Sequence, residues 1–544
     1  MTHKTNAESP GLNGDQHPFT DPSADVIFCS SDNVHFRLHK IILSLSSDFF
    51  RDMLSLSQPS LPSAHTEHAG NGSATSDTEV DEIPVVRVTE TAGTLEPLFQ
   101  LIYPIKDLVL ESVDDVRLVL EAALKYQIRK IIEVARRRLL ELAPIAPLRV
   151  YAIACRYSDA LEDVIGVAAT QVLRQEVQHT YVEELEDISV GAYHRLLYYC
   201  ECGGDVPPGF AFHRAPAEPA ERDTVEDTED IASSAWKDEE QPDGDQGASL
   251  GLFKPDESSE VIVQTSDRVH LGVPRNILQL SSPVLSARLA TLPADTSGVL
   301  LEVAETSRAM RILLEIYHPA CDAPLPTGAP QIVAAVMAAE KLQMKKAVSL
   351  LRCALKDLLQ KLLSHATVMM DVDSLLELYL AACCFEWQDL ACAVARRSLG
   401  LDITKSPIRG IDLYRVSGGC LFRLLDYHRR CREATRGVVT ITSLERIAMQ
   451  WLLGQWKCLD TYCDSTPPCW MQLYLKVVSE FPRPTSAWAM GEGTLNRIAE
   501  GSLCSLCSTP KVGLILAKFS KHVAGVLDAR VDEVVLDWKS AGLR

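Results

Sequence analysis

Two stretches of the chain share one pattern of hydrophobic and polar positions. Residues 25–30 and their counterparts from 260 form short apolar runs rich in β-branched side chains, each followed by a turn and a second short run. Helical spacing follows in the first stretch at Ile41, Ile42, Leu45, Phe49, Phe50 and Met53. The order predicts a strand, a hairpin partner over 34–38 and then a helical segment.

The pattern continues with a third strand and a series of helices. In the first stretch the strand is expected at 85–88, with helices at 95–103, 114–125 and 128–142. Asp114 and Asp115 are candidate N-cap residues for the second of these helices. In the second stretch, helices are expected to end near 316–317 and to cover 330–342 and 345–362, with Pro330 in a first turn.

The two stretches form an internal repeat. Residues 25–54 align without a gap with 260–289, at an offset of 235. Further matches follow in the same order: VRVTET (86–91) with LEVAET (301–306), EAALKYQIRKII (121–132) with MAAEKLQMKKAV (337–348), Tyr151–Tyr157 with Tyr379–Phe385, and RLLYY (195–199) with RLLDY (423–427). A conserved order of matches indicates duplication of one structural unit.

Composition divides the chain into folded and polar segments. Residues 1–18, 57–82 and 203–256 are rich in polar, acidic, Pro or Gly residues and are expected to be a disordered terminus, a disordered insertion and an acidic linker. The remainder predicts two α/β (α+β) modules at 19–142 and 257–362, each a small sheet flanked by helices, helical regions at 146–202 and 366–432, and a Cys- and Trp-bearing helical region at 438–544. The chain is therefore expected to be mostly helical.

The run ADVIF…VHFRLHKIILSLSSDFFRDML resembles the opening of BTB/POZ domains. The matching positions are Asp25, Val26, Phe36, His39, Lys40, Leu43, Ser46, Phe49, Phe50 and Met53. The second copy departs from the pattern at Pro274 and Val284. The whole chain is similar to multi-domain BTB proteins of fungi, which have two tandem BTB modules. The resemblance implies a protein-interaction fold that dimerises or recruits partners.

Acidic and basic residues of the two copies define one candidate site. Asp25 and Lys40 are 15 residues apart, and the second copy has Glu260 and Arg275 at the same spacing. The resemblance places such a pair, with His39, in a partly buried charged pocket beside the dimer face. Two interpretations stay open: a pocket for a peptide or corepressor, and an ion pair that closes the hairpin onto the helix.

Four cysteines of the tail define a second candidate. Cys458 and Cys463 precede Cys469–Trp470, and Cys504 and Cys507 form a CxxC motif. Four thiolates can hold a structural zinc ion in tetrahedral geometry. The two pairs lie farther apart than in usual zinc fingers, so buried cysteines in a helical core are the alternative.

Charge and composition restrict the remaining classes of function. The formal net charge of −20 argues against direct nucleic-acid binding and against docking on an anionic membrane. No apolar leader or membrane-length run is present, and the 16 cysteines lie scattered in helical patterns, which favours the cytoplasm or nucleus.

The sequence predicts a non-catalytic scaffold or adaptor without a cofactor. No hydrolase, nucleotide-binding or metalloprotease motif is found. Protein partners are expected, bound through homodimerisation or through intramolecular pairing of the modules. Two narrower alternatives are a substrate adaptor of a cullin-type ubiquitin ligase, with Val80, Asp81 and Glu82 as the candidate signal, and a transcriptional co-regulator without its own DNA-binding module.

Overall fold

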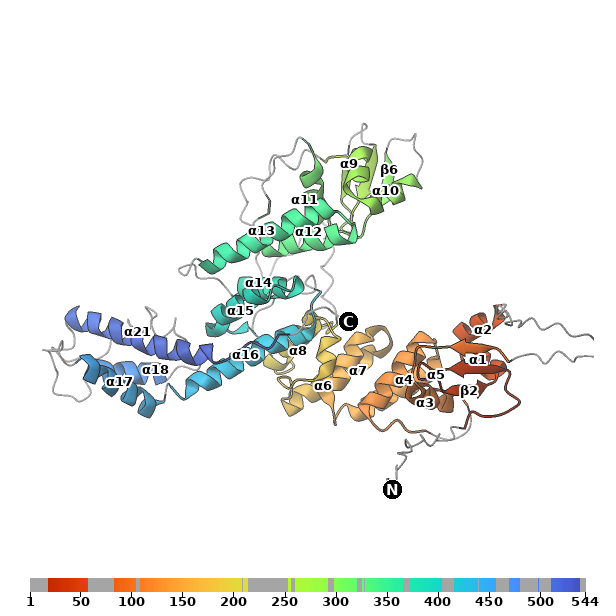
Figure 1. Cartoon of the computed structure of the whole chain (residues 1–544), viewed down its shortest axis with the longest axis horizontal. Helices are drawn as coiled ribbons and strands as arrows, with labels where there is room; N and C mark the ends of the chain where they lie inside the picture. Colours follow the sequence, from red (N-terminus) through yellow and green to blue (C-terminus); the bar gives the residue numbers. More distant parts are fainter. Residues whose placement is uncertain are drawn as a thin grey trace, which may run out of the picture. The chain divides into compact units, whose positions relative to one another are not determined.

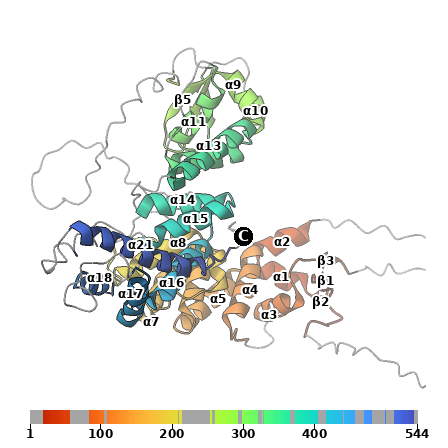
Figure 2. The ribbon, with the colours of Figure 1, turned by 60° about the vertical axis from the view of Figure 1, so that its left-hand side comes forward.

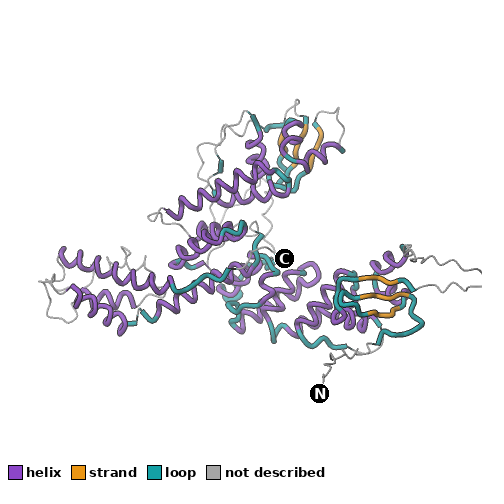
Figure 3. Tube along the Cα trace, viewed as in Figure 1, coloured by secondary structure: helices purple, strands orange, loops and turns teal. Residues whose placement is uncertain are grey.

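The computed structural model divides the chain into two compact units, residues 1–184 and 185–544. It describes residues 18–56, 83–103, 108–207, 209–213, 253–255, 260–291, 298–319, 325–326, 328–364, 372–403, 415–438, 440–455, 469–479, 498 and 510–538. Within these ranges helices predominate, and strands are confined to two small sheets (Figure 3). The insertion predicted at 57–82 lies outside the described residues.

The first sheet contains three strands in the order β2-β1-β3 (Figure 1, with all three strands labelled in Figure 2). β1 (Val26–Cys29) pairs antiparallel with β2 (His35–Leu38) and parallel with β3 (Val85–Arg87). Asn33 has a positive φ of 62° in the hairpin turn, a conformation that Asn tolerates better than most residues. The three strands confirm those predicted at 25–30, 34–38 and 85–88.

The helical stretch after the hairpin is two helices, not one. Ser47 has an extended backbone between α1 (Lys40–Ser46) and α2 (Asp48–Ser55). Its hydroxyl oxygen accepts a hydrogen bond from the Phe50 amide at 3.3 Å and caps α2, while the hydroxyl donates to the carbonyl oxygen of Tyr126. Apolar spacing alone did not show this break, because Ser46 and Ser47 leave the helical period intact.

Three further helices complete the first module: α3 (Ala92–Ile102), α4 (Val113–Lys125) and α5 (Arg129–Leu142). The N-cap of α4 is Ser112, which forms a capping box with Asp115. The prediction of Asp114 or Asp115 as the N-cap is therefore wrong, although Asp115 takes part in the capping box from the third helical position. Asp114 instead forms an ion pair with Arg149, with 2.5 Å between Oδ1 and Nη2.

Aromatic side chains fill the interior of this module. Phe28, Phe36 and Phe99 are fully buried, and the ring of Phe99 meets the other two edge-on with centroids 5.7 and 5.4 Å away. Phe19, from the segment that precedes β1, also meets Phe99 edge-on at 5.8 Å. Edge-to-face contacts add specific geometry to the burial of apolar area.

The second unit contains a sheet with the same topology. β4 (Val261–Gln264) lies between β5 (His270–Val273) and β6 (Val299–Glu302), antiparallel to the first and parallel to the second. The helices that follow are α9 (Arg275–Ser281), α10 (Pro283–Ala290), α11 (Ser307–Tyr317), α12 (Ala329–Lys341) and α13 (Lys345–Ser364). Pro330 lies in the first turn of α12, as predicted.

Helical regions follow each of the two sheet-containing parts. They contain α6 (Pro147–Arg156), α7 (Ser158–Gln175), η1 (Glu183–Glu186) and α8 (Val190–Glu201), and later α14 (Val372–Cys384), α15 (Gln388–Arg397), η3 (Ser398–Gly400) and α16 (Gly418–Arg436). Figure 2 shows the same elements from a second direction. Near both ends of the range expected to be a linker, 203–256, the structure describes residues that pack against the fold. Phe212 packs edge-on against Tyr199, and Phe253 is buried, with its carbonyl oxygen bonded to the Gly272 amide of β5.

In the tail, α17 (Ile441–Gln455), α18 (Cys469–Ser479) and α21 (Pro510–Asp532) share a hydrophobic core. Phe519 is fully buried there and meets Trp470 and Tyr474 edge-on. None of the helices in the described ranges combines the length and the apolar character that a membrane crossing needs.

A half-buried carboxylate joins β3 to the end of α4. Glu90 lies 2.6 Å from the ammonium nitrogen of Lys125 and accepts a hydrogen bond from the Tyr126 hydroxyl at 2.5 Å. Desolvation by burial raises the pKa of Glu90, but the hydrogen bonds from Lys125 and Tyr126 outweigh it, so the pKa lies below its ordinary value of 4.5.

The depressed pKa of Glu90 predicts a contribution to stability that depends on pH. It is present above the ordinary pKa of 4.5 and is lost as the pH falls through the lower folded-state pKa. Glu90→Gln should therefore lower the unfolding free energy at pH 7 and reduce its decline below about pH 4.5. Urea unfolding followed by circular dichroism, at pH 7 and below about pH 4.5, measures these free energies. Glu162→Gln, at an exposed position of α7, is the control. An unchanged decline in Glu90→Gln would contradict the prediction.

Candidate functional site

Asp25 and Lys40, the first candidate pair, are in contact at the start of α1, but Asp25 binds the main chain of Lys40 and not its side chain. The carboxylate Oδ1 of Asp25 accepts a hydrogen bond from the backbone amide of Lys40 at 2.7 Å. The first amides of a helix have no partner within the helix and carry partial positive charge, so an acid supplied from the adjoining strand stabilises that end. His39, at the N-cap position, makes no side-chain cap of its own.

This geometry corrects the ion pair expected between Asp25 and Lys40. Both residues lie in the described part of the chain, and no ion pair links the Lys40 ammonium group to Asp25 there. In the second copy, Glu260 likewise accepts from the backbone amide of Arg275, at 2.8 Å. The spacing of 15 residues is therefore explained by a helix cap, which requires an acid at the first position and places no demand on the charge of the second.

His39 belongs to a chain of hydrogen bonds that also includes residues not singled out from the sequence. The Tyr103 hydroxyl oxygen accepts from the His39 amide at 2.7 Å and lies 3.3 Å from Nδ1 of the same residue. On the other side of the ring, Nε2 lies 3.1 Å from the Ser23 hydroxyl, which donates to Asp21 at 2.7 Å. In the sequence, Tyr103 lies in IYP (102–104), which resembles IYHP (316–319) of the second stretch.

Electrostatics in this chain of hydrogen bonds favours a neutral tyrosine and an ionised aspartate. Burial raises the pKa of Tyr103, and the nearby acids Asp25 and Asp21 raise it further, against the lowering effect of the His39 amide. Hydrogen bonds from Ser23 hold the pKa of Asp21 below its ordinary value. The arrangement fixes the start of α1 and contains no activated nucleophile.

The outer face of α1 presents apolar side chains to solvent. Ile41 is 65% exposed and Leu45 is 75% exposed, whereas Leu43 between them is fully buried. Residues four apart in a helix lie on one face, so the two exposed side chains are neighbours. On α9 of the second copy, Leu280 is 85% exposed at the position of Leu45, but Asn276 replaces Ile41. The first copy therefore has the more apolar outer face.

The predicted zinc ligands Cys458, Cys463, Cys504 and Cys507 lie outside the described residues. In the ranges that are described, no group of three or more His, Cys, Asp or Glu side chains could hold a metal ion. Zinc binding by the tail stays a prediction.

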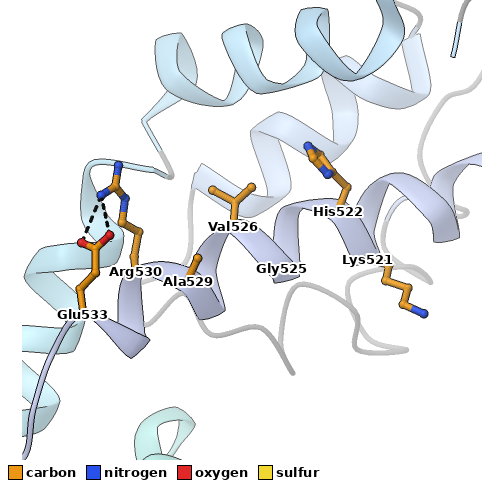
Figure 4. A pocket seen from close by; sticks show the side chains of 7 residues that line it. All are labelled: Lys521, His522, Gly525, Val526, Ala529, Arg530 and Glu533. Atoms are coloured by element: carbon orange, nitrogen blue, oxygen red, sulfur yellow. Dashed lines mark hydrogen bonds and ion pairs between the residues drawn. The ribbon is translucent and has the colours of Figure 1, made fainter. Parts of the chain in front are cut away.

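A surface pocket lies along α21 (Figure 4). Its lining residues are Lys521, His522, Gly525, Val526, Ala529, Arg530 and Glu533. Arg530 already donates to both carboxylate oxygens of Glu533 at 3.1 Å. The lining comes from one face of a single helix and includes none of the residues singled out from the sequence, so we assign this pocket no role.

A comparison with known families gives the class of the first sheet-containing part. Residues 19–142 match the family model of the BTB/POZ domain. The chain thus carries a BTB/POZ domain, a module that mediates protein–protein interactions and dimerisation and is generally not enzymatic. No curated protein and no solved structure matches the chain significantly.

The cap geometry predicts unequal effects of substitutions at Asp25 and Lys40. Asp25→Ala should lower the unfolding free energy by about 1 kcal/mol, because the first amide of α1 loses its acceptor. Asp25→Asn should lose less, since the amide oxygen can still accept. Lys40→Ala should change stability by less than about 0.5 kcal/mol. Urea denaturation of the wild type, these three variants and the Asp25→Ala, Lys40→Ala double variant tests this. Equal losses in Asp25→Ala, Lys40→Ala and the double variant would instead support an ion pair.

Proposed function

We propose that the protein is a non-catalytic scaffold that dimerises through the outer face of α1 in its BTB/POZ domain. The observation that carries this proposal is the exposed pair Ile41 and Leu45 on a helix held in place by Asp25. Large apolar side chains that gather on one exposed face are typical of protein interfaces. A second copy of the same face is the proposed occupant, because symmetric pairing is the commonest form of self-association.

The second sheet and its helices form, in this proposal, a BTB-like module in tandem with the first. Contacts at corresponding positions support it. Glu305 pairs with Lys341 at 2.8 Å, as Glu90 pairs with Lys125. Ser282 caps α10 and donates to the Leu342 carbonyl, as Ser47 does for α2 and Tyr126. This module lacks the apolar pair on its outer helix and is proposed to recruit a different protein or to be structural.

We also propose that the protein acts in the cytoplasm or nucleus. The described cysteines are free thiols, which fits the reducing environment of the cytoplasm or nucleus. Val80, Asp81 and Glu82, on which the cullin-adaptor alternative depends, lie outside the described residues. The co-regulator alternative and the likeness to fungal tandem-BTB proteins stay predictions from the sequence.

Light scattering of the full-length protein over a range of concentrations tests the proposed dimer. The wild type is expected to be a dimer at micromolar concentration, and the Ile41→Asp, Leu45→Asp double variant a monomer, because the two charges would have to be desolvated in the interface. Leu280→Asp should stay dimeric. Ile145→Asp, at an exposed position outside the module, is the matched control.

Two outcomes of this measurement would refute the proposed dimer. One is a wild-type protein that stays monomeric at every concentration, which would favour intramolecular pairing of the modules. The other is a double variant that dimerises as well as the wild type.

A further inference from the structure

Helices α8 and α16 begin at an antiparallel contact between two segments far apart in the sequence. Both segments belong to the second unit, and both views show the helices beside each other (Figures 1 and 2). Ser189 and Ser417 form an isolated β-bridge immediately before the two helices. In the repeated helical regions each residue corresponds to the one 228 positions later, so Ser417 is the counterpart of Ser189.

The main-chain bonds on the two sides of this bridge are reciprocal. The Val190 amide donates to the Val416 carbonyl at 2.9 Å, and the Gly418 amide donates to the Ile188 carbonyl at 2.8 Å. Gly418 is the counterpart of Val190, and Val416 is the counterpart of Ile188. Equivalent residues that exchange equivalent contacts are the mark of a two-fold interface between identical subunits. Here both partners come from one chain.

A buried ion pair makes the contact unequal. The carboxylate of Glu186 accepts hydrogen bonds from the guanidinium of Arg423, which is 5% exposed, and from the Ser417 hydroxyl at 2.7 Å. The counterpart of Glu186 is Tyr414, so the sequence supplies this carboxylate once. The two serines differ accordingly, because Ser189 caps its own helix through the Ala192 amide at 3.1 Å.

Close packing adds a second inequality. A Cβ atom placed on Gly418 would lie 2.9 Å from the Cβ of Tyr193 and 3.2 Å from the carbonyl oxygen of Leu185. On Gly419 it would overlap the carboxylate of Glu186, which is the far end of a flexible side chain. The Tyr193 Cβ and the Leu185 carbonyl cannot move aside without a shift of the main chain, so position 418 favours glycine. The counterpart of Gly418 in the first helical region is Val190, whose side chain would not fit there.

These differences favour the contact of α8 with α16 over a contact between two α8 segments or between two α16 segments. Two α8 segments would bring Val190 against Tyr193, where no Cβ fits. Two α16 segments would leave the buried Arg423 without a carboxylate, because Glu186 is present in the first segment alone. An interface discriminates between partners by such clashes and unpaired charges as much as by its favourable contacts.

We infer that residues 185–201 and 415–436 form a clasp, selective for each other, that holds the two halves of the chain together independently of their covalent connection. The partner surface of the first helical region is thus the second helical region of the same protein. This inference does not rest on the proposed dimer, which uses the outer face of α1.

Proteolytic cleavage of the full-length protein tests the clasp. A specific protease site inserted within residues 214–252, with an affinity tag at the N-terminus, allows the chain to be cut completely, as checked on a denaturing gel. The N-terminal half is then captured at about 1 µM, and the co-retained C-terminal half is measured. Wild-type halves should stay together, because a complex tighter than this concentration survives capture.

Substitutions in the clasp should release the C-terminal half. Gly418→Val should lower its retention at least about tenfold, as should Glu186→Arg or Arg423→Glu, since each leaves a clash or an unpaired buried charge. Glu186→Arg combined with Arg423→Glu should recover retention, which misfolding could not explain. Arg429→Glu is the matched control, because Arg429 is on α16 but is half-exposed and pairs with Asp426 and Glu433 of its own helix.

Three results would overturn the inference. Wild-type halves that separate after cleavage would show that the clasp does not hold them. Retention of the Gly418→Val halves at the wild-type level would show that other contacts do. A double charge exchange that performs no better than the single variants would exclude the Glu186–Arg423 pair as a determinant of selectivity. The dimer is read out separately, by the Ile41 and Leu45 variants.

Discussion

An acid at the start of each central strand caps the helix that follows the hairpin. Asp25 and Glu260 each accept a hydrogen bond from the first amide of α1 or α9. A helix N-terminus presents unsatisfied amides and partial positive charge, so a carboxylate from the neighbouring strand both stabilises the helix and ties it to the sheet. The direction in which Ile41 and Leu45 face solvent depends on this tie. The surface offered to a partner is thus set by a contact made elsewhere on the same helix.

The two copies of the repeat agree in contacts that involve the main chain and differ in side chains that face outward. Ser47 and Ser282 both donate to a carbonyl oxygen at the end of a later helix, and both cap the helix that they precede. Main-chain groups are the same for every residue, so such contacts persist while sequences diverge. The outer helix face has no such constraint, and there Asn276 stands where the first copy has Ile41.

In the helical regions, too, the main-chain contacts agree and the side chains differ, but here the differing side chains lie in the contact itself. Reciprocal main-chain bonds around Ser189 and Ser417 keep the symmetry of the repeat, whereas Glu186 and Gly418 break it. The contact therefore joins two similar segments through unlike side chains. We infer a division of roles in which the sheet-containing parts display surfaces and the helical regions hold the halves of the chain together.

Short apolar runs and helical spacing predicted the strands and most helices, because burial of apolar side chains imposes patterns that a single sequence shows. The repeat was evident from matches that follow in the same order along the chain. The residue types near the candidate site were also evident, including Asp25, His39 and Lys40. What only the tertiary structure decided was which atoms meet. The acid of Asp25 binds a backbone amide, Ser47 divides one helical period into two helices, and Glu186 meets Arg423 across more than two hundred residues. Every residue has the same main-chain groups, so the sequence does not indicate which of them accept or donate a given hydrogen bond. Partners far apart in the sequence are determined by how the segments pack, so no local pattern predicts these contacts.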